Sequence, residues 1–208
     1  MIALVLSLAT TVLALIWLGP LLTIWRGSIT AHMLAHMGVV AIAAPLLAIG
    51  LAQRLPRTKA PMLVGMPLVA SVVELVVVWG WHAPAARRFA QGTLVGTVSE
   101  QASFLAAGLF LWLSCLAAAG GGKASRVSGA FGLLLTTIHM TLLGALLALS
   151  PRPLYASGEV TCFGVTLSAA QDQQLGAVVM LLIGAATYLA GGIGLLAGLF
   201  CNTDRRAA

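Results

Sequence analysis

Charged residues are scarce in this chain: Lys, Arg, Asp and Glu together make up 8% of its 208 residues, and only five residues are acidic. Soluble globular domains carry about 25% charged residues, so a soluble domain and a charge-rich disordered chain are both excluded. The few acids form no closely spaced pair, and the sequence contains no Ser-His-Asp arrangement or Gly-rich phosphate loop. We therefore predict that the protein is not an enzyme.

Cysteine is also rare, and the three residues are Cys115, Cys162 and Cys201. An odd number at wide spacing, with no C-x-x-C pair, argues against a disulfide framework or a thiolate metal site. The net charge of +6 is spread over short loops and forms no basic patch. It indicates orientation in a bilayer, and we expect no binding to nucleic acid.

Hydrophobic residues are abundant: they make up 60% of the chain, and the mean hydropathy is +1.04. A helix needs about 20 apolar residues to cross a hydrocarbon core. The predicted fold is all-α, a polytopic membrane bundle of six transmembrane helices that forms a single transmembrane domain, residues 1–208. The first span lacks the basic start and the cleavage pattern of a signal peptide, so we expect a retained helix. The expected spans are residues 2–25, 29–51, 62–82, 99–119, 128–150 and 169–200.

Basic residues favour one orientation of these spans. With both termini cytoplasmic, the inner segments hold seven of the 11 Lys and Arg residues and the outer segments hold four, in agreement with the positive-inside rule. The bilayer lipid is thus an expected partner. The inner residues are Arg54, Arg57, Lys59, Lys123, Arg126, Arg205 and Arg206, and the outer residues are Arg26, Arg87, Arg88 and Arg152.

Three of the four histidines are followed directly by methionine, as His32-Met33, His36-Met37 and His139-Met140. Residues four apart lie on one face of a helix, so His32 and His36 are able to bind the same ion. Met33 and Met37 form a neighbouring stripe, and thioether sulfur suits Cu(I) better than hard cations. The pattern predicts a soft-metal site within the membrane. Methionines that only pack and hydrogen-bonded histidines would give the same pattern.

Other polar residues are expected at the outer ends of the spans. His82 ends the third span, Glu100 starts the fourth and Asp172 starts the sixth. Asp172 is expected first of all to cap its own helix, with pairing to Arg152 or orientation of an outer histidine as a second role. Glu100 is either a first-turn acid or a support for a metal-binding histidine.

Two ionisable residues are expected deeper in the bilayer. Glu74 lies roughly 12 Å below His82 at 1.5 Å per residue, and His139 lies near the midplane. A carboxylate at such a depth costs about 2.5–3.5 kcal/mol, so Glu74 should be protonated, paired or solvated. Both a neutral Glu74 bonded to Ser or Thr on another helix and a role in proton or metal handling fit this position.

Glycine and proline predict packing surfaces and loops. Gly191, Gly194 and Gly198 share one helix surface, which predicts the close approach of another helix. Pro151 and Pro153 start the longest outer loop, residues 151–168. That loop is long enough to act as a lid or a docking surface.

A series of short motifs runs in order along residues 28–190. Each motif alone is weakly specific, but the ordered set with these spacings is fairly specific. The motifs are His32-Met33-x-x-His36-Met37, Ala44-Pro45-Leu46-Leu47, Trp81-His82-Ala83-Pro84, Ser103-Phe104, Ser150-Pro151-Arg152-Pro153-Leu154-Tyr155 and Asp172-Gln173-Gln174. Through these ordered motifs, the chain resembles the polytopic CtaG-type cytochrome c oxidase assembly factor family.

The resemblance implies a protein of the bacterial inner membrane that helps to mature haem-copper oxidases, with an oxidase core subunit as its partner. It also implies delivery of copper to the buried copper centre of the oxidase. By the resemblance, His32, His36 and His82 are Cu(I) ligands and Asp172 supports them. A periplasmic copper chaperone is a further expected partner.

The chain departs from the family pattern at one place. The family has a Glu-His pair before Leu-Ser-Phe, whereas this chain has Glu100 followed by Gln101. Either His139 replaces the absent ligand, or this member has lost metal transfer and acts as a structural partner of an oxidase.

Three other functions are also compatible with the sequence. A metal-free accessory subunit would dock to an oxidase through its glycine face and the 151–168 loop. A membrane b-type haem protein would clamp haem between His36 and either His139 or His82. An ion transporter is the weakest alternative, because Glu74 is the only acid expected deep in the membrane.

Overall fold

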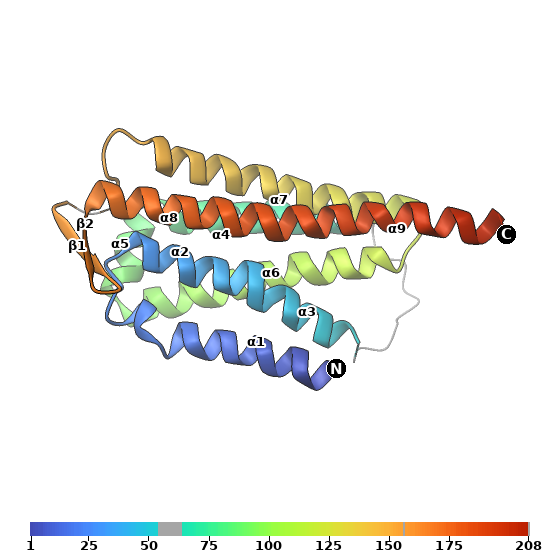
Figure 1. The fold of residues 1–208 in the computed structure, drawn as a ribbon, viewed down its shortest axis with the longest axis horizontal. Coiled ribbons are helices and arrows are strands. Elements are labelled where there is room, and N and C mark those ends of the chain that lie inside the picture. Colours follow the sequence, from blue (N-terminus) through green and yellow to red (C-terminus); the bar gives the residue numbers. More distant parts are fainter. Residues whose placement is uncertain (54–63, 156, 208) are drawn as a thin grey trace.

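Long apolar helices make up most of the computed structural model, which describes residues 1–53, 64–155 and 157–207 (Figure 1). Within these residues, five helical stretches are long and apolar enough to cross a membrane, or six if α4 and α5, which meet at 73°, form one bent span. The prediction of an all-α multi-pass membrane protein is confirmed. The helices are α1 (Ile2–Trp17), α2 (Ile29–Met37), α3 (Ala44–Ala52), α4 (Met66–His82), α5 (Pro84–Gly92), α6 (Leu94–Ala119), α7 (Lys123–Leu149), α8 (Ala169–Gly184) and α9 (Ala190–Ala207).

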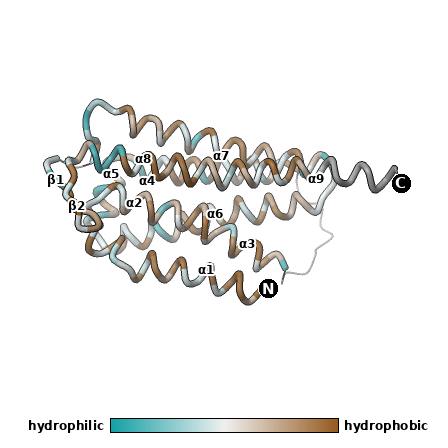
Figure 2. Tube along the Cα trace, in the orientation of Figure 1, coloured by the Kyte–Doolittle hydropathy of each residue, from teal (hydrophilic) through white to brown (hydrophobic). Residues whose placement is uncertain are grey.

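The two ends of the bundle differ in composition. The N-terminus and the end of α9 lie at one end, and α5 lies at the other (Figure 1). Hydrophilic residues gather around α5, whereas the middle parts of the helices are mainly hydrophobic (Figure 2). We call the end with α5 the outer end. Several predicted inner positions lie outside the described residues: positions 62 and 63, Arg54, Arg57, Lys59, and the side chains of Cys201, Arg205 and Arg206.

The second predicted span is continuous, but it is not a uniform α-helix. A π-helical segment, Gly38–Ala43, joins α2 to α3. Pro45 explains this segment, because it has no N–H and its ring collides with the carbonyl four residues earlier. In the π register the Val40 carbonyl faces the nitrogen of Pro45, which has no hydrogen to donate. The indole of Trp112 on α6 donates to this carbonyl over 3.1 Å instead.

A second π-helical segment, Ala185–Leu189, joins α8 to α9. It contains Tyr188, whose side chain is fully buried and stacks on Trp112 at a centroid distance of 5.6 Å. The two π-helical segments thus meet around the same indole ring. Irregular turns of this kind in two spans place polar main-chain and side-chain groups in the centre of the bundle.

The helix α5 was missed by the sequence prediction, which placed residues 83–98 in a loop. Pro84 occupies the first turn of α5, where its missing N–H has no cost. One face of this helix is buried through Arg87 and Ala90. The next helix, α6, begins at Leu94 and not at the predicted residue 99.

The predicted outer loop, residues 151–168, contains a β-hairpin. Strands β1 (Glu159–Cys162) and β2 (Val165–Ser168) pair antiparallel, with Cys162 opposite Val165. Phe163 and Gly164 form the two-residue turn, with positive φ values of 50° and 77°. The ring of Phe163 lies 4.2 Å from that of Trp25, centroid to centroid. The hairpin is thereby packed against the connection between α1 and α2.

Candidate metal site

Three histidines come together near the outer end of the bundle. His32 and His36 lie on α2, His82 is the last residue of α4, and each is at most 5% exposed. The centroid of the His82 ring lies 5.1 Å from that of His32 and 5.1 Å from that of His36. The His32 and His36 rings are 6.2 Å apart. We call these three residues the histidine cluster.

Phe104 of α6 closes one side of the histidine cluster. Its ring stacks on His36 at 4.3 Å and lies about 6 Å from the other two rings. Aromatic carbon offers no hydrogen bond to an imidazole nitrogen. The side of the histidine cluster that faces Phe104 is therefore apolar.

Five of the six imidazole nitrogens in the histidine cluster lack hydrogen-bond partners within the described chain. His82 Nδ1 lies 2.7 Å from the Val78 carbonyl oxygen. A carbonyl only accepts, so Nδ1 carries the hydrogen and Nε2 carries the lone pair. His82 Nε2 and both nitrogens of His32 and His36 are buried and have no partner among the described residues. Since buried polar atoms are almost always paired, these unpaired nitrogens fit a bound ion, which would take one nitrogen from each of the three rings.

The spacing of the rings agrees with a shared ion. A metal about 2.0–2.1 Å from an imidazole nitrogen lies roughly 3.2 Å from the ring centroid. Two rings that share an ion are then at most roughly 6.4 Å apart, and all three pairs in the histidine cluster meet this limit. In the part of the chain that the structure describes, no three His, Cys, Asp or Glu side chains are already placed to hold one metal ion, so the three rings would have to rotate to share one.

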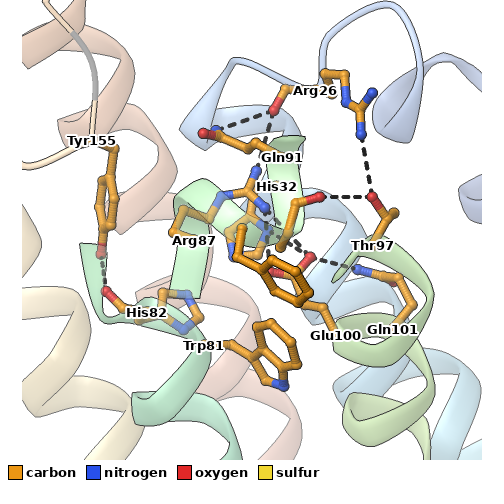
Figure 3. A network of polar contacts seen from close by, with 12 residues as sticks. Arg26, His32, Trp81, His82, Arg87, Gln91, Thr97, Glu100, Gln101 and Tyr155 are labelled. Carbon is orange, nitrogen blue, oxygen red and sulfur yellow. Dashed lines mark hydrogen bonds and ion pairs between the residues drawn. The ribbon is translucent and has the colours of Figure 1, made fainter. Parts of the chain in front are cut away.

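A buried ion pair lies beside the histidine cluster on its outer side (Figure 3). Arg87 of α5 donates to Glu100 of α6 over 3.2 Å, and also to the main-chain carbonyl of Arg26 over 3.3 Å. Glu100 Oε2 is 3.8 Å from His32 Nδ1, which is too far for a hydrogen bond. Gln101 donates to the same oxygen over 3.4 Å. The charge of Glu100 is thus balanced by Arg87 before any cation binds.

The 151–168 loop reaches the histidine cluster through Tyr155. Its hydroxyl donates to the main-chain carbonyl of His82 over 2.8 Å (Figure 3). Burial raises the pKa of Tyr155 to about 12, and nearby Arg87 opposes this shift in part. The hydroxyl therefore remains a donor at neutral pH. This bond anchors the bend between α4 and α5.

Asp172 has a different role from the one predicted. The prediction that it caps its own helix was wrong, because Ser168 caps α8 in a capping box with Gln171. Asp172 instead caps α2, the neighbouring helix that carries His32. Its carboxylate accepts from Ser28 Oγ at 2.7 Å, from Ile29 N at 2.6 Å and from Thr30 N at 3.2 Å.

Several predicted site residues lie outside the histidine cluster. Met37 points to α8, where its methyl group packs beside Gly184, and Met33 is buried in the apolar core. His139 is buried on α7 with both nitrogens unpaired in the described chain, and it lies near enough to His36 for an electrostatic interaction. It takes no part in the three ring pairs that define the histidine cluster. Arg152 is exposed, and within the described residues it forms no ion pair with Asp172.

Glu74 lies deeper in the bundle than the histidine cluster and is bonded to hydroxyl groups. Tyr188 donates to it over 2.9 Å and Thr136 over 3.3 Å. Of the two alternatives for Glu74, the bond to a Ser or Thr of another helix is present. The bond to Tyr188 was not predicted from the sequence.

The sequence reasoning also missed Arg87 and Phe104 as neighbours of the site. Arg87 was predicted to be a cation in a loop. Arg87 and Ala90, three residues apart, are both buried, whereas Arg88 is exposed, which is the pattern of a short amphipathic helix. Phe104 occurred in a recognised motif, Ser103-Phe104, without a role. Its position opposite His36 depends on how α6 packs on α2.

Comparisons with known proteins agree with the motif resemblance. Searches of the curated proteins and of the solved structures gave no match. A family model described as cytochrome c oxidase caa3 assembly factor matches residues 3–200, which is nearly the whole chain. The chain therefore belongs to the cytochrome c oxidase caa3 assembly factor family.

Proposed function

We propose that the protein binds Cu(I) through His32, His36 and His82 and delivers it to a core subunit of a haem-copper oxidase during assembly. One observation carries this proposal: five buried imidazole nitrogens without partners in the described chain lie in one enclosed cluster. Membership of an oxidase assembly family supplies the acceptor. The oxidase is then the partner, and Cu(I) is the cargo.

The composition of the histidine cluster suits a transferable ion. Imidazole binds copper well, and Cu(I) accepts a low number of ligands. The Glu100 charge is already balanced by Arg87, so the histidine cluster itself offers only neutral ligands. A site of neutral ligands releases a monovalent ion more readily than a site with a free carboxylate. Histidines of the acceptor would then displace His32, His36 and His82 one at a time.

The same geometry favours copper over haem. A haem clamped by two histidines places the macrocycle between their rings. The rings of His36 and His82 have centroids 5.1 Å apart, a separation that leaves no layer for a porphyrin. His139 makes no ring contact with either of them among the described contacts.

We further propose that copper enters from the periplasmic side of a bacterial inner membrane, with both termini in the cytoplasm. Helix α5 and the hairpin lie at the end away from the N-terminus (Figure 1), and His82 of the histidine cluster is two residues before the start of α5. Under the positive-inside rule this is the outer end. A periplasmic copper chaperone would then approach the α5 and hairpin surface.

An anaerobic competition titration with a colorimetric Cu(I) chelator tests the proposal. The full-length protein in detergent should withdraw Cu(I) from the chelator, and His32→Ala, His36→Ala and His82→Ala should each weaken this competition. His139→Ala is the matched control, because it removes a buried histidine that lies outside the histidine cluster. Equal competition by all four variants and the wild type would contradict the proposed site.

An oxidase maturation assay separates copper delivery from a metal-free docking role. Gly194 on α9 has no described atom within 4 Å of the position of an added Cβ, so this face is open to a partner helix. If the three cluster variants mature the oxidase normally and Gly194→Leu does not, the accessory-subunit function is favoured instead.

A further inference from the structure

A second polar group of side chains lies in the membrane core, and the copper site makes no use of it. It consists of Glu74 and Ser71 on α4, Thr136 on α7 and Tyr188 in the π-helical segment, all fully buried. Tyr188 donates to one oxygen of Glu74 and Thr136 to the other, and the Ser71 hydroxyl is 2.8 Å from that of Thr136. We call these four residues the Glu74 network.

No cation neutralises Glu74 within the described chain, where the ion pairs involve Glu100 only. The titratable groups around it are uncharged partners: Tyr188 from the last span, Cys115 from α6 and, one turn beyond Thr136 on α7, His139. An unpaired carboxylate in such surroundings is strongly unfavourable. These surroundings favour a bound proton on Glu74 as long as no positive charge lies nearby.

The Glu74 network satisfies both protonation states of the carboxyl group. When Glu74 is ionised, Tyr188 and Thr136 both donate to it and Ser71 donates to Thr136. When Glu74 carries a proton, it donates to Thr136 and Thr136 donates to Ser71, because each hydroxyl both donates and accepts. The two protonation states thus differ in the orientation of two hydroxyl groups, those of Thr136 and Ser71. Ser71 lies toward the start of α4, so the hydroxyl chain leads away from the histidine cluster.

A cation in the histidine cluster needs a compensating negative charge. The structure describes the side chains of four of the five acidic residues, all but Asp204. Of these four, Glu100 is already paired with Arg87, and Asp172 is held by three donors at the start of α2. Glu159 lies in the exposed hairpin. Glu74 is on the same helix as His82, eight residues away, or roughly 12 Å along the axis.

We propose that the Glu74 network is a proton-binding site that releases its proton when a cation occupies the histidine cluster. The O–H bond of Glu74 breaks as its proton passes to Thr136, Thr136 gives its own proton to Ser71, and Ser71 gives one to water on the inner side of α4. The carboxylate left behind compensates the charge of the cation. The reaction is a proton exchange without oxidation or reduction. This coupling depends on the proposed copper site, whereas the proton site itself does not.

Infrared spectroscopy of the full-length protein in lipid nanodiscs tests the proton site without metal. The metal-free protein should show the carbonyl stretch of a protonated carboxylic acid. The band should shift on labelling with ¹³C-glutamate, disappear in Glu74→Gln and remain in Glu159→Gln. Labelling assigns the band to a glutamate, and its persistence in Glu100→Gln would separate Glu74 from the other buried glutamate even if Glu74→Gln does not fold. The absence of any glutamic acid band in the wild type would overturn the proton site.

Addition of Cu(I) to the same samples tests the coupling. The wild type and Glu159→Gln should lose the band and release about one proton per bound Cu(I), as measured with a pH indicator dye. Glu74→Gln should release none. Cu(I) binding by the wild type without proton release overturns the coupling. Failure of the wild type to bind Cu(I) overturns the proposed copper function, and the metal-free band still decides the proton site.

Discussion

Replacement of Asp172 should destabilise the protein strongly, although this residue lies on a different helix from the histidines that it supports. Its buried carboxylate accepts three hydrogen bonds from the first residues of α2, at 2.6–3.2 Å. Each buried donor left without a partner costs about 1–3 kcal/mol. Asp172→Ala should therefore lower the free energy of unfolding by at least about 3 kcal/mol.

Asp172→Asn tests the same contact with almost no change in shape. The amide keeps one acceptor oxygen but turns an NH₂ group toward a main-chain N–H. We therefore expect the free energy of unfolding to fall by about half as much as in Asp172→Ala. Glu159→Gln in the exposed hairpin is the control, because it removes an acidic charge without a buried contact. Unfolding of the purified protein in mixed detergent micelles by added SDS, followed by tryptophan fluorescence, gives the free energies.

The reasoning on Asp172 would be refuted if Asp172→Ala unfolded within about 0.5 kcal/mol of the wild type, the range of ordinary surface substitutions. The Cu(I) affinity of Asp172→Ala should also fall, since α2 carries His32 one turn from the capped end. If Asp172→Ala is destabilised but keeps its affinity for Cu(I), Asp172 stabilises the fold without positioning the histidine cluster.

Three further predictions concern packing, the π-helical segment and pH. Trp112→Phe should lower the free energy of unfolding by about 1–3 kcal/mol, because it leaves the main-chain carbonyl freed by the π-helical segment without a donor; SDS unfolding measures this. Gly176→Ala should destabilise by about 1–3 kcal/mol, since an added Cβ meets main-chain atoms of α2 at 3.1 Å, whereas Gly194→Ala, in open space, should be neutral or stabilising by up to about 1 kcal/mol. Burial raises the pKa of Tyr155 from 10.0 to about 12, so its hydroxyl contributes stability that is present below pH 10 and lost as the pH rises to about 12. Tyr155→Phe should remove this pH dependence, and thermal unfolding at pH 8 to 12 compares the two proteins.

The sequence predicted the helices and the histidine pair because both depend on local periodicity. An apolar run of span length is helical in a membrane whatever its neighbours, since its main-chain groups have no other partners. His32 and His36 share a face for a similar reason. The prediction that His82 lies beside them was less direct. It was based only on the position of His32 and His82 at the outer ends of two different spans.

The elements that the sequence did not predict depend on contacts between distant segments. Asp172 has the local pattern of a first-turn cap, and only the packing of α8 on α2 shows which helix it serves. The hairpin turn Phe163-Gly164 lacks the Asn-Gly signal of two-residue turns, and Phe163 accepts a positive φ where its ring packs on Trp25. The partner of Glu74, Tyr188, likewise faces it only through the π-helical segment.

X-ray absorption of the Cu(I)-loaded protein tests most directly whether three histidines share one Cu(I). We expect a first coordination sphere of nitrogen with the multiple scattering of imidazole, and fewer imidazoles in His82→Ala. Equal spectra for His139→Ala and the wild type would complete the assignment. A sphere dominated by sulfur, or one unchanged in His82→Ala, would contradict the claim and place copper on methionine or cysteine.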